Sequence, residues 1–203
     1  MLLYAVTDRA WLRGRALPAL VEDAVRGGAT FVQLREKEME FAAFLDEARR
    51  VKAVTDRYHV PFVINQNRYS ILDRTVEKNG LKETAAKLGK GIITFSPLAQ
   101  GRLTDRYLHG IPADSRVHTD GRFLKESDLT PELLGRIAKL NDLAAARGQT
   151  LAEMALAWLL AKEEITSVLI GASRPSQILD NIKAVENTGF TAEELAEIDR
   201  LSV

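Results

Sequence analysis

The sequence predicts an α/β protein in which short buried strands alternate with amphipathic helices. Apolar and β-branched runs of about six residues recur along the chain, as expected for buried strands. The segments between them repeat apolar residues three and four positions apart, which is the spacing of one helix face. Because strands that alternate with helices pair in parallel, we expect a parallel sheet covered by helices.

Five segments are expected to be strands, namely Leu2–Thr7, Thr30–Arg35, Val60–Asn65, Gly91–Phe95 and Thr166–Gly171. Helices are expected at residues 17–25, 41–51, 75–88, 130–147, 151–162, 175–185 and 191–201. Pro131 suits the first position of its helix, and Thr191 with Glu194 forms a capping box. The polar stretch Arg102–Ser127 has no sustained periodicity, so we expect a loop there.

The length of the chain limits how these units close. A complete eight-stranded (βα) barrel takes about 250 residues, so a chain of 203 residues is short by roughly three units. Five strands in sequential order leave two open edges, which proteins normally protect. Either the strands reorder into a doubly wound sheet, or a partner chain covers the edges. We therefore expect self-association, most simply as a homodimer.

The composition excludes several classes of function. Lys plus Arg and Asp plus Glu both number 28, so a net charge of zero predicts neither a nucleic-acid nor a membrane partner. The chain has no cysteine, and its three histidines lack metal-ligand spacing, so we expect no metal site. The first residues become charged too quickly for a signal peptide, and no apolar run approaches about 18 residues. A cytoplasmic protein is expected.

Residues 1–65 resemble thiamine-phosphate synthases. The resemblance rests on LYAVTD, on GGATFVQLREK and on VPFVIN, which match the first three strands of that family of barrel enzymes. It implies that Arg35 and Lys37 lie at the carboxyl end of a strand and bind a diphosphate. The family continues its third strand with Asn-Asp, whereas here Gln66 follows Asn65, and a neutral amide is a poor magnesium ligand. The alternative is that Arg35 and Lys37 are only solvated.

Residues 60–203 resemble the C-terminal half of an aldo-keto reductase, in the group with potassium-channel β-subunits and glyceraldehyde-3-phosphate reductases. The matching stretches are VPFVINQNRYSILDR, GIITFSPLAQGRLTDRYLHGIPADSR and SVLIGASRPSQILDN. Both families are TIM barrels, and VPFVIN fits both. The two resemblances together predict a single α/β domain over 1–203, an incomplete barrel joined within Val60–Asn65. A laboratory chimera explains the missing strands better than a natural gene.

The reductase resemblance implies a weak NADP(H) site. Gln66 is expected at the nicotinamide carboxamide, Phe95 against the nicotinamide ring, and Ser96, Pro97 and Leu98 along the pyrophosphate. Further contacts are implied to the phosphates and adenosine, by Arg106, Arg116, Ser173, Arg174, Gln177, Asp180 and Asn181. The alternative interpretation makes Phe95 a core residue and the two loop arginines merely solvated.

The same resemblance implies that catalysis is lost. The family reduces carbonyls with a tyrosine acid assisted by Lys, Asp and His, all from earlier strands that this chain lacks. Without an acid to protonate the alkoxide, hydride transfer loses orders of magnitude. We expect a chimera without a complete catalytic site that retains weak NADP(H) binding. The alternatives are an NADPH-dependent reductase and a diphosphate-binding protein of the synthase type.

Overall fold

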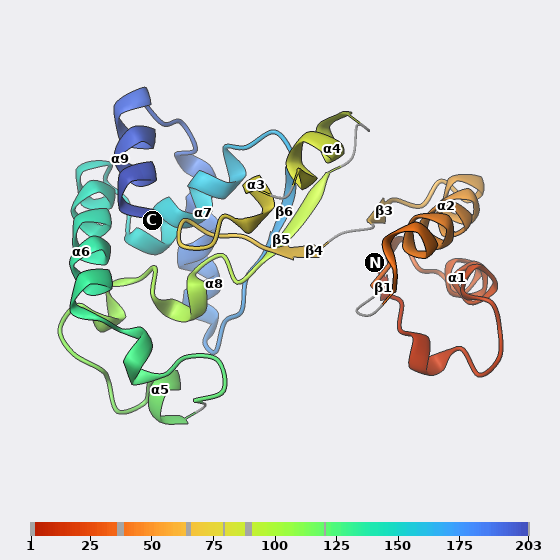
Figure 1. Ribbon diagram of the computed structural model, residues 1–203, viewed down its shortest axis with the longest axis horizontal. Coiled ribbons are helices and arrows are strands. Elements are labelled where there is room, and N and C mark those ends of the chain that lie inside the picture. The colour runs from red at the N-terminus through yellow and green to blue at the C-terminus, as the bar shows by residue number, and fades with distance from the viewer. Residues whose placement is uncertain are drawn as a thin grey trace. The chain divides into compact units, whose positions relative to one another are not determined.

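The computed structural model describes residues 3–35, 39–63, 66–78, 80–87, 91–119 and 121–202. The chain divides into two compact units, residues 1–66 and 67–203, and each unit is described by itself (Figure 1). The prediction that residues 1–203 form one domain stays a prediction. Among the described residues, no helix is both long and apolar enough to cross a membrane.

The first unit is a small parallel sheet covered by two helices. Its elements are β1 (Tyr4–Val6), a 3-10 turn (Arg9–Trp11), α1 (Leu17–Arg26), β2 (Phe31–Gln33), α2 (Phe41–Arg57) and β3 (Phe62–Val63). The strands pair in parallel in the order β1-β2-β3. Val21 of α1 and Val51 of α2 pack with Val32 and Leu34 in one apolar cluster.

The second unit contains a second three-stranded sheet. Its strands are β4 (Gln66–Arg68), β5 (Ile92–Phe95) and β6 (Ile165–Leu169), in that order, with β5 and β6 parallel. Its helices are α3 (Thr75–Lys78), α4 (Leu81–Lys87), α5 (Arg116–Thr119), α6 (Pro131–Ala146), α7 (Leu151–Leu160), α8 (Pro175–Ile182) and α9 (Ala192–Ser202). Helix α7 packs against both β6 and α6, and α9 packs against α6 (Figure 1).

The sheets differ from the expected single five-stranded sheet. The described residues form two three-stranded sheets, and neither sheet is reordered in the doubly wound manner. The difference arises at the expected strand Val60–Asn65. There β3 ends at Val63 beside β2, and β4 begins at Gln66 beside β5, so each side of the junction pairs with strands of its own segment.

Two helical predictions also need correction. The expected helix over 75–88 is divided into α3 and α4, because Gly80 adopts a left-handed φ of 74° that ends a right-handed helix. The expected loop at 102–127 contains α5 and the 3-10 turns Asp105–Tyr107 and Glu126–Asp128. The other expected helices are confirmed, including the capping box in which Glu194 N donates to Thr191 Oγ1 and Thr191 N donates to Glu194.

Gly91 provides a test of the pairing between β5 and β6. A Cβ at this position would lie 1.5 Å from Thr166 Oγ1 and 2.8 Å from Thr166 Cβ. We therefore expect Gly91→Ala to destabilise the protein by about 1–3 kcal/mol in urea unfolding followed by circular dichroism. The matched control is Gly135→Ala, within α6, where a Cβ meets nothing within 4 Å. That change should stabilise by up to about 1 kcal/mol. Equal effects of the two substitutions would contradict the close approach.

Candidate nucleotide-binding site

The expected cofactor residues come mainly from the segments that follow β5 and β6. Phe95, the last residue of β5, stands opposite Leu169, the last residue of β6. Because the strands are parallel, residues 96–98 and residues 170–177 leave the sheet at the same edge. Leu98 and Val168 pack against the same apolar cluster beneath this edge. Ligands of open parallel sheets usually bind here, just beyond the carboxyl ends of the strands.

The loop after β5 holds a strained backbone. Ser96, Ala99 and Gln100 have φ values of 54°, 49° and 65°, in the left-handed region that side chains with a Cβ disfavour. Two hydrogen bonds fix the loop: Gln100 Nε2 donates to Ser96 Oγ at 3.1 Å, and Ala99 N donates to Ser96 O at 3.0 Å. Pro97 is buried. Strain of this kind concentrates at functional sites. Here the two hydrogen bonds hold the strained backbone of the expected pyrophosphate segment in place.

The ring of Phe95 is half-buried and has a cation beside it. The guanidinium carbon of Arg68 lies 5.9 Å from the ring centroid. Arg68 was not among the residues predicted from the sequence, because β4 is the polar segment QNR, which carries no strand pattern. Gln66 begins β4, and its side chain lies outside what the structure describes. Phe95 is therefore a partly accessible aromatic face with an exposed arginine next to it.

The start of α8 is organised by Gln177. Its Oε1 accepts hydrogen bonds from Ser173 N at 2.8 Å, Arg174 N at 3.2 Å and Ser173 Oγ at 3.2 Å. The structure thus brings together three of the expected adenosine-side residues, at a helix N-terminus where an anion is favoured. Gln177 acts here as a cap, a role that the sequence analysis did not predict. The side chain of Arg174 is exposed.

The remaining expected residues of this region are more scattered. Asp180 forms an exposed ion pair with Lys183 at 3.0 Å, and Asn181 is buried. Arg106 Nη2 lies 2.8 Å from Asp114 Oδ1, so its charge is already balanced within the long connection after β5. Arg116 begins α5, and its side chain lies outside what the structure describes.

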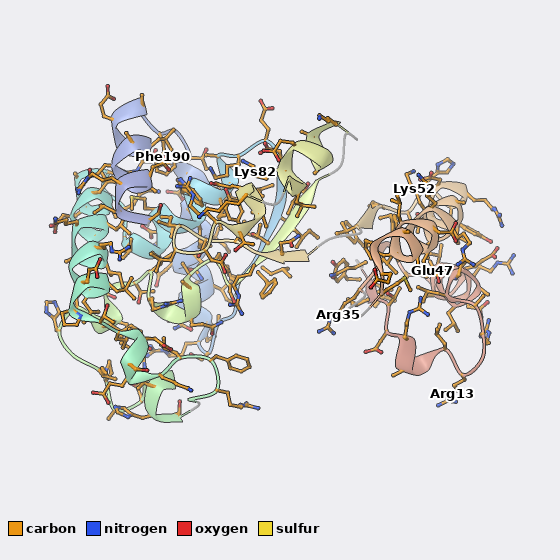
Figure 2. All side chains as sticks on the ribbon, viewed as in Figure 1. Arg13, Arg35, Glu47, Lys52, Lys82 and Phe190 are labelled. Carbon is orange, nitrogen blue, oxygen red and sulfur yellow. The ribbon has the colours of Figure 1, made fainter. Side chains whose placement is uncertain are left out.

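The first unit carries the expected phosphate-binding residues. Arg35 follows β2, its backbone N–H donates to Thr7 Oγ1 at 2.9 Å, and its side chain is exposed at the surface (Figure 2). Lys37 lies outside the described residues. The structure therefore fixes the backbone of Arg35 between the ends of β1 and β2. Among the residues described, no group of three histidine, aspartate or glutamate side chains could hold a metal ion.

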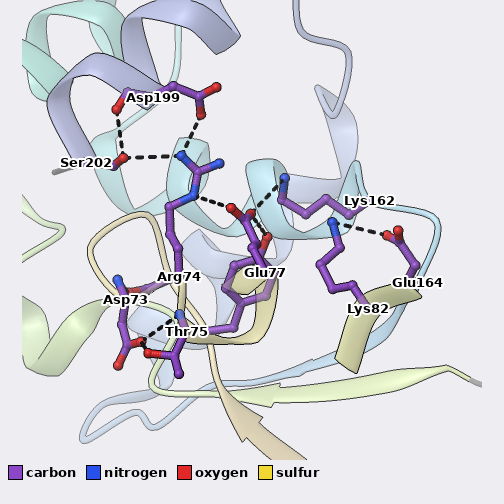
Figure 3. Close-up of polar contacts among 11 residues, drawn as sticks. Asp73, Arg74, Thr75, Glu77, Lys82, Lys162, Glu164, Asp199 and Ser202 are labelled. Carbon is purple, nitrogen blue, oxygen red and sulfur yellow. Dashed lines mark hydrogen bonds and ion pairs between the residues drawn. The ribbon is translucent and has the colours of Figure 1, made fainter. Parts of the chain in front are cut away.

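A polar network around Glu77 was not anticipated from the sequence (Figure 3). The hydroxyl of buried Tyr69 donates to Glu77, Arg74 Nε lies 2.9 Å from Glu77 Oε2, and Lys162 Nζ lies 3.8 Å from Glu77 Oε1. Arg74 also reaches Asp199 at 2.6 Å. The network joins α3, the end of α7 and α9, segments that lie far apart in the sequence.

The environment shifts the pKa values of this network. Burial and the hydrogen bond to Glu77 raise the pKa of Tyr69, so Tyr69 stays protonated. Burial opposes ionisation of Glu77, but the hydrogen bond from Tyr69 and the charge of Arg74 outweigh it and lower the pKa of Glu77. Burial and the nearby Lys82 lower the pKa of Lys162. Tyr69 is fully buried, so we interpret the network as structural support for the second unit.

Two protein families match overlapping parts of the chain. The thiamine monophosphate synthase family profile matches residues 3–78, and the aldo/keto reductase family profile matches residues 44–203. The overlap includes the junction between β3 and β4. Both resemblances predicted from the sequence are therefore confirmed.

Individual relatives agree with the second match. L-glyceraldehyde 3-phosphate reductase of Escherichia coli K12 is 43% identical over 160 residues, and that of strain O157:H7 is 44% identical. Each alignment covers 76% of this chain and 46% of the relative. A putative voltage-gated potassium channel subunit beta of Schizosaccharomyces pombe is 33% identical over 80% of this chain and 48% of its own length. The chain thus spans about half the length of these relatives.

Among solved structures, an aldo-keto reductase from Bacillus halodurans in its holo form has a similar fold. Its TM-score is 0.66 and its sequence identity 20%, over 99% of this chain and 72% of that chain. This likeness supports the fold alone, an α/β fold with parallel sheets. The family profile covers more than half of the residues. The chain therefore belongs to the aldo/keto reductase family, with a thiamine monophosphate synthase-like segment at its N-terminal end.

Proposed function

We propose that this chain is a recombined barrel protein, most simply an engineered one, that binds NADP(H) weakly and has no complete catalytic site. The observation that carries the proposal is the shared sheet edge. The strained segment after Phe95 and the capped start of α8 both follow the carboxyl ends of the parallel strands β5 and β6. Those are the two segments in which the reductase resemblance locates most of the dinucleotide contacts.

The residues present fit a dinucleotide in chemical type. Arg174 supplies an exposed cation at a helix N-terminus for the 2′-phosphate, and the fixed loop 96–98 supplies backbone groups for the pyrophosphate. Phe95 supplies an aromatic face for the nicotinamide ring. When bound, NADPH provides a hydride. The chain's own residues bind and orient the nucleotide.

Existing contacts explain why the affinity should be low. The backbone N–H groups of Ser173 and Arg174 already donate to Gln177, and Arg106 is paired with Asp114. A phosphate has to compete with these partners before it gains the same hydrogen bonds. The exchange leaves only part of each interaction as net binding free energy.

The proposal is tested by NADPH fluorescence titration together with a steady-state assay on a reactive aldehyde. We expect saturable binding without measurable turnover, since the chain lacks the family's tyrosine acid and the residues that assist it. Turnover that Phe95→Ala abolishes would show an active reductase instead. No saturation by NADPH at millimolar concentration would refute the binding site itself.

Arg174 should determine the preference for the phosphorylated nucleotide. Because its guanidinium is expected at the 2′-phosphate, Arg174→Ala should weaken NADPH binding about tenfold, equivalent to about 1.4 kcal/mol. Binding of NADH, which lacks this phosphate, should not change. Lys139→Ala is the control, because Lys139 is an exposed cation on α6, a helix that carries none of the expected nucleotide contacts. An equal loss for both nucleotides in Arg174→Ala would contradict the assignment.

A further inference from the structure

A single cation lies beside the aromatic ring at the expected nicotinamide position. Arg68 is the last residue of β4, and Tyr69 N donates to Phe95 O at 3.3 Å, so the ends of β4 and β5 lie next to each other. The guanidinium carbon of Arg68 lies 5.9 Å from the centroid of the Phe95 ring, and the side chain of Arg68 is exposed. Any ring that stacks on Phe95 is therefore close to a positive charge.

The charge of Arg68 is not balanced by a neighbouring carboxylate. Arg68 forms no ion pair with any residue that the structure describes. The segments that directly follow the three strands, residues 69–72, 96–98 and 170–173, contain no charged residue. Arg174 comes next after the third of these segments, and it is expected at the 2′-phosphate, on the adenosine side of the nucleotide. The electrostatic environment of the Phe95 ring is therefore set mainly by Arg68.

The nicotinamide ring changes its charge with its oxidation state. The ring is a pyridinium cation in NADP⁺ and a neutral dihydropyridine in NADPH, whereas the phosphates of the two nucleotides are the same. A guanidinium next to the ring therefore repels the oxidised form alone. We infer that Arg68 determines the oxidation state that the site prefers, by favouring NADPH over NADP⁺. The inference rests on the proposed nucleotide site, in which the nicotinamide ring lies against Phe95.

The distance between the two charges sets the size of the effect. Stacked aromatic rings have centroids about 4.5–7 Å apart, so a nicotinamide ring on Phe95 lies roughly 10 Å from the guanidinium of Arg68. Two like charges at about 10 Å weaken binding about twofold at the dielectric constant of water and about fifteenfold at an effective value of about 20. Because Arg68 is exposed, we expect an intermediate effect of about fivefold at low salt. Added salt should reduce it.

The experiment measures the dissociation constants of NADP⁺ and NADPH by isothermal titration calorimetry at low ionic strength. The ratio of the NADP⁺ constant to the NADPH constant should fall about fivefold in Arg68→Gln, which removes the charge. Arg68→Lys keeps the charge and should keep the ratio. Salt at about 0.5 M should bring the wild-type ratio close to that of Arg68→Gln. Lys139→Gln, which removes an exposed cation from α6, is the matched control and should leave the ratio unchanged.

A third ligand separates the role of Arg68 from the proposed site itself. The fragment 2′-phospho-ADP-ribose has the phosphates but no nicotinamide, so it should bind the wild type and Arg68→Gln with similar affinity. A ratio unchanged in Arg68→Gln, with both nucleotides still bound, would overturn the role of Arg68 and leave the nucleotide site in place. Equal tightening of NADP⁺ and NADPH in Arg68→Gln would mean that Arg68 only blocks the ring, which also contradicts the inference. Saturation by none of the three ligands would refute the site and the inference together. Circular dichroism confirms that each variant is folded.

Discussion

Trp158→Ala is expected to destabilise the second unit by about 3–5 kcal/mol, the usual cost of removing a buried large aromatic side chain. Trp158 is 1% exposed on α7 and meets Tyr69 edge to face, with ring centroids 5.3 Å apart. Arg74 and Lys162 lie 5.0 Å and 4.0 Å from its ring centroid. The substitution therefore removes apolar burial, an aromatic pair and two cation–π contacts at once. The measurement is urea unfolding followed by circular dichroism.

Two further variants separate these contributions. Trp158→Phe keeps an aromatic ring against Tyr69, so we expect a loss well below that of the alanine variant. Phe123→Ala removes an aromatic side chain that is 59% exposed, and its effect should stay within about 0.5 kcal/mol. If Trp158→Ala cost no more than Phe123→Ala, the packing of α7 described here would be wrong.

The elements with local signals could be predicted from the sequence. Helix α6 begins at Pro131, and Thr130 Oγ1 accepts a hydrogen bond from Leu133 N, so its start is encoded by adjacent residues. Strand β5 was predicted within one residue because GIITF is short, apolar and β-branched. Helix α9 was predicted from its capping box. In each case the residues that determine the element lie within one turn of each other.

The features that could not be predicted depend on which strands and side chains come into contact in the folded chain. Strand β3 uses only Phe62–Val63 of the apolar VPFVIN run, whereas β4 is the polar segment Gln66–Arg68 that follows the run, and its pairing beside β5 leaves no apolar pattern in the local sequence. Gln177 is expected at the 2′-phosphate by resemblance, and the hydrogen bonds by which its side chain caps α8 are a further role that periodicity does not reveal. The pair of Arg74 with Asp199 joins residues 125 positions apart, a separation at which one sequence without homologues carries no signal.

Glu77→Gln is the second substitution with a large expected effect, because Glu77 accepts the hydrogen bond of Tyr69 and forms ion pairs with Arg74 and Lys162. The amide keeps the size of the side chain but removes the charge that Tyr69, Arg74 and Lys162 contact. A hydrogen bond to a charged group, such as that from Tyr69, contributes about 1.5–3 kcal/mol, and Arg74 retains Asp199 as an ion-pair partner. We expect a loss of about 2–3 kcal/mol at neutral pH in urea unfolding.

The pH dependence identifies the cause of that loss. The pKa of Glu77 is lower in the folded protein than its usual 4.5, so the unfolded chain binds more protons as the pH falls through this window. The charge of Glu77 therefore stabilises the fold above pH of about 4.5, and this contribution disappears as the pH falls through the lowered folded pKa.

The difference in unfolding free energy between wild type and Glu77→Gln should shrink on acidification. Glu132→Gln, on an exposed pair with Arg136, controls for general acid effects. A difference that stays constant down to the acid limit would show that Glu77 acts through shape and not through charge.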